Sequence, residues 1–169
     1  MNDSLVDRTV VESLIAKLLI DGPDMVEPAI RVLYPTDPVP DPSPDDGVGG
    51  SDTPIDQWCR LNSAVMVPDA KRNESGDQDQ QGFVMSITVG ASDAQILATP
   101  TRIGYNQHLI VAALSGAHSE HAATSHHIQI NSAKEDEQAA GTHAATRNGV
   151  IMLSGIATRV SGRAASLTL

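Results

Sequence analysis

The second half of the chain shows a regular alternation of apolar and polar positions, which predicts the order strand, helix, strand, strand. Residues 82–91 (GFVMSITVGA) carry larger apolar side chains at every second position, as a strand with one buried face requires. Residues 127–133 (HIQINSA) and 149–160 (GVIMLSGIATRV) predict two further strands, which we expect to be antiparallel. Residues 99–116 have helical spacing and precede these two strands.

The helix predicted at residues 99–116 has recognisable ends. Thr99 is expected to cap it and Pro100 to occupy its first position. The backbone nitrogen at the first position donates no hydrogen bond within the helix, so proline, which has no N–H, is tolerated there. Gly116 is expected to end it. One face of this helix would carry Ile103, Ile110, Val111 and Leu114.

The first half of the chain predicts a second helix, at residues 4–20, where apolar residues recur at helical spacing. Ser4 followed by Asp7 resembles a capping arrangement, and Gly22 and Pro23 stop the helix. Residues 29–34 predict a short extended run. Residues 57–67 (QWCRLNSAVMV) predict a strand whose hairpin partner is residues 82–91.

Two loops interrupt this pattern. Residues 35–54 are rich in proline, glycine and aspartate, so they predict a long, irregular, acidic loop. Residues 68–81 form a polar connection that is long for a hairpin, and we expect it to project into solvent or onto a partner. We treat residues 1–169 as a single domain, because the segment before the acidic loop is too short to fold alone.

Together these elements predict an α+β fold: a mixed, mainly antiparallel sheet of about four to five strands, covered by the N-terminal helix and one central helix. The aromatic content is only 2%, so the core must consist mainly of aliphatic side chains. Burial of each such side chain contributes about 1.5–3 kcal/mol, which conformational entropy largely offsets. We therefore hypothesise that partner subunits add to the stability of this fold.

Charge narrows the classes of partner. The formal net charge is −10 and no window is rich in Lys or Arg, so nucleic-acid binding and binding to an anionic membrane are disfavoured.

We find no secretory signal and no apolar run long enough to span a bilayer, and we expect synthesis in a cytoplasm. Cys59 is the single cysteine, and its place in a predicted strand favours a buried thiol over a reactive one.

A cluster of histidines between residues 118 and 127 is the first candidate for chemistry. Imidazole and carboxylate groups are ligands that zinc accepts. The segment AHSEHAATSHH nevertheless predicts a flexible connection, and metal sites need rigid placement and supporting partners. We therefore predict no metal site here, and pH-sensitive assembly is an alternative role for clustered histidines. The candidate ligands are His118, Glu120, His121, His126 and His127.

Three other motifs are candidates for a catalytic or ligand-binding site. Ser92 follows a strand but lacks the glycine pattern of a nucleophile elbow, so we predict that it caps a helix. Residues 47–50 (GVGG) do not precede a helix or a Lys, which argues against a phosphate-binding loop. The acidic loop does not match the calcium-loop spacing of an EF-hand; its carboxylates are Asp37, Asp41, Asp45, Asp46, Asp52 and Asp56. We predict no catalytic, cofactor-binding or metal-binding residue, and hence no enzyme.

The order of elements resembles the tail terminator, or tail completion, proteins of long-tailed bacteriophages. The matching pieces are VDRTVVESLIAKLL, GFVMSITVGAS leading into TPTRIGYNQHLIVAALSG, then HHIQINSA and NGVIMLSGIATRVSG. The resemblance implies a mixed α+β domain whose subunits form a ring of six copies at the end of the tail tube. It implies self-association, contacts with the tail tube and with head–tail connector or neck proteins, and a place in the virion. The proline-rich loop and the strongly negative charge depart from that family.

Other functions compete with this expectation. Head-to-tail adaptor, neck and capsid decoration proteins of the same virions have a similar size and lack of chemistry. A metal-dependent hydrolase would use His118, His121 and one of His126 or His127. A host regulatory or binding module with a small ligand pocket is a third alternative.

Overall fold

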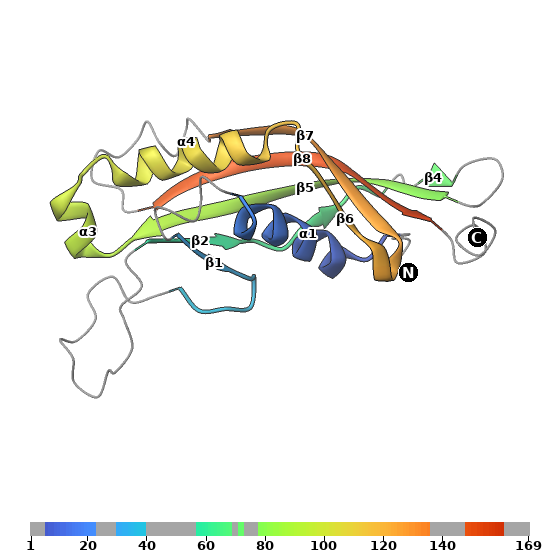
Figure 1. Cartoon of the computed structure of the whole chain (residues 1–169), viewed down its shortest axis with the longest axis horizontal. Helices are drawn as coiled ribbons and strands as arrows, with labels where there is room; N and C mark the ends of the chain where they lie inside the picture. Colours follow the sequence, from blue (N-terminus) through green and yellow to red (C-terminus); the bar gives the residue numbers. More distant parts are fainter. Residues whose placement is uncertain are drawn as a thin grey trace.

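A computed structural model of the chain describes residues 6–22, 30–39, 57–68, 71–72, 78–135 and 148–160. Its described strands form one sheet in the order β1-β2-β5-β8-β7-β6, and two short strands, β3 and β4, also pair with β5 (Figure 1). β5 (Gln78–Ala91) and β8 (Asn148–Val160) are the long central strands and are antiparallel along their whole length. The described part of the sheet therefore has eight strands, more than the four to five predicted.

The remaining strands extend the sheet on both sides of this central pair. β7 (His126–Glu135) pairs with β8, and β6 (His118–His121) forms the edge beyond it. On the other side lie β2 (Gln57–Leu61), β3 (Val65–Met66) and β4 (Lys71–Arg72), all antiparallel to β5. β1 (Arg31–Leu33) is parallel to β2. The sheet is thus mixed and mainly antiparallel, as predicted, and residues 57–67 do pair with residues 82–91.

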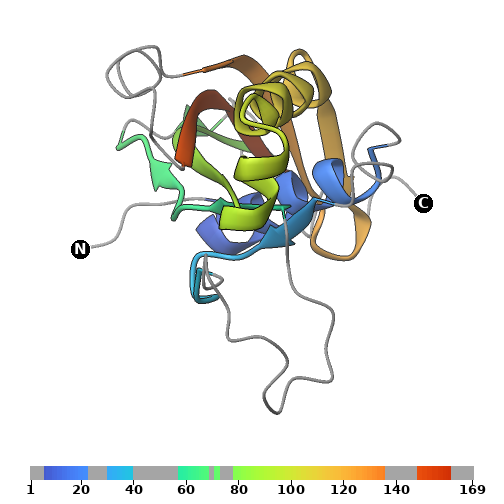
Figure 2. The ribbon, with the colours of Figure 1, turned by 90° about the vertical axis from the view of Figure 1, so that its left-hand side faces the viewer.

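Two long helices cover one face of the sheet. α1 (Arg8–Ile20) packs against β1, β6 and β7, and α4 (Arg102–Leu114) packs against β5, β7 and β8. Figure 1 shows α4 along β8 and β7 and α1 beside the β6–β7 hairpin, and Figure 2 shows the strands curving around α1. The face that holds the helices is called the concave face below, and the opposite one the convex face. No helix in the described ranges has the length and apolar character needed to cross a membrane.

The core between the helices and the sheet is aliphatic, as the composition predicted. Its fully buried side chains include Leu14, Ile87, Ile110 and Ile151, and Phe83 is the aromatic member of the main cluster. Phe83 lies opposite Gly155 in the β5–β8 pair, and a Cβ on Gly155 would stand 2.8 Å from the Phe83 ring. The absence of a side chain at residue 155 therefore lets Phe83, the largest fully buried side chain of the described residues, pack against the neighbouring strand.

The predicted helix ends need two corrections. α1 begins at Arg8, with Asp7 as its cap; Ser4 lies outside the described residues. Thr99 does not cap the central helix, because it ends a short additional helix, α3 (Asp93–Ala98), and its amide donates to Gln95. α4 starts only at Arg102, after a turn that contains Pro100. The predicted end is right, since Gly116 adopts a positive φ of 69° directly after the helix.

Two segments predicted to be loops contain ordered strands. The histidine-rich stretch forms β6 and a short 3₁₀ turn, η1 (Ala122–Thr124), before β7 begins. Residues 78–81 of the expected projecting loop are the first part of β5, where Asp79 and Gln81 are buried. Polar residues form strands here because their backbone groups join the ladder and their side chains find partners. Most of the acidic loop, residues 40–54, lies outside the described residues.

Candidate functional site

The β6–β7 hairpin divides the candidate metal ligands between the two faces of the sheet. Directly paired residues of antiparallel strands share a face, and the pairs are Glu120 with His127 and His121 with His126. His118 lies two residues from Glu120 and therefore shares its face. The set proposed for a hydrolase, which needs His118 and His121 together, is split between the faces. Within the described residues no three His, Cys, Asp or Glu side chains are grouped closely enough to hold a metal ion.

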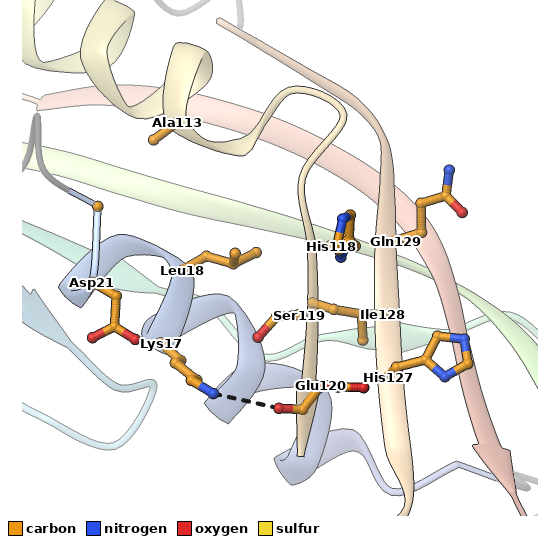
Figure 3. Close-up of a pocket in the computed structure, with 11 residues that line it drawn as sticks. Lys17, Leu18, Asp21, Ala113, His118, Ser119, Glu120, His127, Ile128 and Gln129 are labelled. Atoms are coloured by element: carbon orange, nitrogen blue, oxygen red, sulfur yellow. Dashed lines mark hydrogen bonds between the residues drawn. The ribbon is translucent and has the colours of Figure 1, made fainter. Parts of the chain in front are cut away.

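A shallow hollow of about 890 Å³ lies where the end of α1 approaches the hairpin (Figure 3). Lys17 and Leu18 line it from α1, Asp21 lines it from the C-cap of that helix, and Ala113 lines it from α4. The Nζ atom of Lys17 donates a hydrogen bond to the backbone oxygen of Glu120, 3.5 Å away (Figure 3). The polar side chains around this hollow are solvent-exposed except that of Ser119, which is half-buried, so most of them lack the desolvated setting in which a binding pocket strengthens polar contacts.

The buried polar residues at the start of β5, Asp79 and Gln81, have structural partners. Asp79 forms an ion pair with Arg159 on β8; the exposed fractions of the two side chains are 4% and 41%. Gln81 accepts a hydrogen bond from the amide of Val6 and donates one to the carbonyl of Val67. The contact with Val6 joins the residues just before α1 to the central strand β5. Together these contacts account for the polar composition of a strand end that faces the core.

The cap of α1 belongs to the same end of the molecule. The side chain of Asp7 accepts hydrogen bonds from the hydroxyl of Thr9, at 2.8 Å, and from its amide, at 2.9 Å. These bonds, the hydroxyl first, hold the pKa of Asp7 below its ordinary value, and the nearby His126 lowers it further. Asp7 therefore stabilises the helix in its charged form.

The remaining sequence candidates have structural roles where they are described. Ser92 caps α3, as predicted, and its hydroxyl accepts a hydrogen bond from the amide of Gln95 at 3.1 Å. Cys59 is fully buried on β2, as predicted, and burial raises the pKa of its thiol to about 12. Asp37 accepts a hydrogen bond from the amide of Tyr34. The other five aspartates of the loop and residues 47–50 lie outside the described residues.

The convex face of the sheet carries an apolar group that the sequence analysis did not single out. Val65 is 60% exposed, and Val84, Met152 and Ile156 are each 41–42% exposed. The register brings them together: Val65 is opposite Val84, Met152 is opposite Ser86, and Ile156 is opposite Gly82. These four residues are neighbours on β3, β5 and β8, facing away from both long helices.

Two cations flank this group. Arg60 on β2 lies opposite Thr88, and Lys134 on β7 lies opposite Met152, so both side chains start from the convex face. Three strand spacings separate them, roughly 14 Å at the usual interstrand distance of about 4.8 Å. We call the six residues Val65, Val84, Met152, Ile156, Arg60 and Lys134 the convex patch.

One signal in the sequence could have revealed the convex patch. The run VIML at residues 150–153 is apolar at four successive positions, whereas a strand with one solvated face alternates. Such a run indicates that both faces carry apolar side chains. The position of the cations beside it depends on pairing between strands far apart in the chain, which periodicity does not reveal.

The sequence of this chain matches no protein-family model and no curated protein.

Proposed function

We propose that this protein is a structural component of a phage virion that forms a homo-oligomeric ring, six copies by the family resemblance, at the end of the tail tube or in the neck. Its work in this proposal is geometric: subunits associate, and the ring joins the tail to the head. The observation that carries the proposal is the convex patch, because exposed apolar side chains gathered on one face are typical of protein–protein contacts.

Two further features support an assembly role over a chemical one. The histidines favoured by the hydrolase alternative are divided between two faces of the hairpin, and Ser92 and Cys59 have structural roles. The sheet also ends in two short strands, β1 and β6, of three and four residues. Short edge strands limit uncontrolled strand addition, which a protein that associates at high local concentration must avoid.

Native mass spectrometry of the untagged protein tests this proposal, combined with electron microscopy of the same sample. We expect a closed ring of defined copy number, and addition of the ring to purified tail tubes should cover their ends. A protein that stays monomeric at concentrations well above micromolar would contradict the proposal. Rings that bind the capsid surface or the head vertex without binding tubes would instead favour the decoration or adaptor alternatives.

A further inference from the structure

The convex face differs in charge from the rest of this acidic chain. The protein has 21 acidic and 11 basic residues, yet the described positions of β2, β3, β5, β7 and β8 that point to the convex face include no carboxylate; on the edge strand β6, the register places Glu120 on that side. The acidic side chains of the other five strands, Asp79 and Glu135, lie opposite Arg159 and Ile151 on the concave side. The convex patch is therefore an apolar centre with cations at its flanks.

Those cations have unused binding capacity. Neither Arg60 nor Lys134 forms an ion pair with any residue in the described ranges. Arg60 donates a long hydrogen bond, 3.5 Å, to Asn62, and its Nε atom is buried without a partner among the described residues. A partly buried guanidinium with an unsatisfied donor gains from a carboxylate supplied by another molecule, because charge-assisted hydrogen bonds are stronger than neutral ones.

The chain itself contains a segment of matching composition. Residues 35–56 hold six aspartates and no Lys or Arg, together with the apolar residues Val39, Val48 and Ile55. Acidic residues interspersed with apolar ones complement a surface that has an apolar centre and cationic flanks. In the sequence this segment lies between β1 and β2, the strand that carries Arg60.

We propose that the convex patch of one subunit binds the acidic segment 35–56 of a second copy of this chain. This inference rests on the proposed self-association and identifies the surfaces that make it. The contact is heterologous, because one subunit contributes the sheet face and the other contributes the segment. Heterologous contacts generate a ring when the rotation between subunits closes. Since the two surfaces are complementary in charge, association weakens as the salt concentration rises.

The test uses the full-length chain and measures its mass distribution by native mass spectrometry and sedimentation velocity. Met152→Glu places a negative charge, of the same sign as the acidic segment, at the centre of the convex patch. Lys134→Glu replaces one flanking positive charge with a negative one. A segment variant replaces Asp41, Asp45, Asp46 and Asp52 with Asn. We expect each variant to raise the dissociation constant of the subunit contact at least about tenfold, because Met152 is at the centre of the patch and the other two variants remove the charge complementarity.

Matched controls separate the proposed contact from general effects of charge. Leu97→Glu introduces the same residue at an apolar position of α3 that is 84% exposed and not on the sheet. Lys17→Glu makes the same charge change as Lys134→Glu, but on α1. Both control proteins should assemble like the wild type. Circular dichroism and thermal melting confirm that every variant is folded, and a Met152→Gln variant replaces Met152→Glu should the latter fail to fold.

Mixing distinguishes the heterologous contact from other arrangements. The Met152→Glu protein keeps an intact segment, and the segment variant keeps an intact patch, so we expect the mixture to form one-to-one heterodimers. A segment variant that assembles like the wild type overturns the inference, since the patch would then bind something else. Patch variants that still form wild-type rings overturn it as well, while leaving the proposed ring intact. A wild-type monomer contradicts the proposed function itself.

Discussion

Replacing Gly155 with Ala tests how closely β7, β8 and Phe83 approach one another. A Cβ on residue 155 would stand 2.3 Å from the backbone oxygen of Gln129 and 2.8 Å from the ring of Phe83. Real contacts of this kind are longer, so the new methyl group must displace the backbone of β7 as well as the ring. Overpacking a well-packed core costs about 1–3 kcal/mol, and the involvement of backbone argues for the upper half of that range.

Gly104→Ala is the matched control, because it adds the same methyl group where nothing lies within 4 Å. Residue 104 is within α4, and alanine in a helix interior is more stable than glycine by about 0.8–1.0 kcal/mol. The two substitutions should therefore change stability in opposite directions. If the urea m-value is about 2 kcal/mol/M, the midpoint falls by roughly 1–1.5 M for Gly155→Ala and rises by roughly 0.4–0.5 M for Gly104→Ala.

The assay is equilibrium unfolding in urea, followed by circular dichroism at one fixed protein concentration, because self-association makes apparent stability depend on concentration. Equal m-values for the two variants and the wild type are required for the comparison. A Gly155→Ala protein as stable as the wild type would refute the reasoning, since β7 and Phe83 would then have room for a side chain at residue 155.

Three further predictions concern the ends of α1 and β5 and the buried thiol. Asp7→Ala should lower the free energy of unfolding by about 0.5–2 kcal/mol through loss of the cap, measured by urea unfolding at neutral pH. Folding lowers the pKa of Asp7, so the stabilisation by its charged side chain should be complete well above pH 3.8 and should be lost as the pH falls through the lowered folded-state pKa. The free energies of unfolding of the wild type and the variant should therefore converge below that folded-state pKa. Asp79→Asn should destabilise the fold by about 1–3 kcal/mol, which is less than the loss expected on breaking a fully buried ion pair, because Arg159 can still reach water. If the same substitution causes no loss of stability in the Arg159→Gln background, the pairing is confirmed. Cys59 should resist a disulfide reagent at pH 8 until the protein is unfolded, since its thiol is buried and its pKa is about 12; fast labelling of folded protein would contradict this.

Strong periodicity made the central elements predictable. The alternation at residues 82–91 and the apolar run at 149–160 correspond to β5 and β8, and the helical spacing near the start corresponds to α1. These elements bury one face over many residues, so their period is visible in the sequence. Ser92 and Gly116 were also interpreted correctly, because capping and positive φ depend on local chemistry.

Elements without an apolar period of their own were missed. α3 is six residues long and buries none of them, so it has no apolar period to detect. β6 is an edge strand of polar residues that exists because its backbone pairs with β7. The first residues of β5 are polar because Asp79 and Gln81 find partners on β8, on the segment before α1 and on the chain after β3. The partners of Asp79 and Gln81 lie 14 to 80 positions away, whereas β6 pairs with a strand only 5 to 11 positions away, which its polar residues do not indicate by any apolar period.

Spacing and composition by themselves determined that this chain builds an aliphatic α+β core with a mainly antiparallel sheet, because burial periods are local properties of a polypeptide. Tertiary structure alone decided the order of the strands, the parallel pairing of β1 with β2, and the division of the histidines between two faces. It also decided that Arg60 and Lys134 flank the apolar centre of the convex patch. Register between strands determines which side chains are neighbours, and register is settled only when the whole sheet assembles.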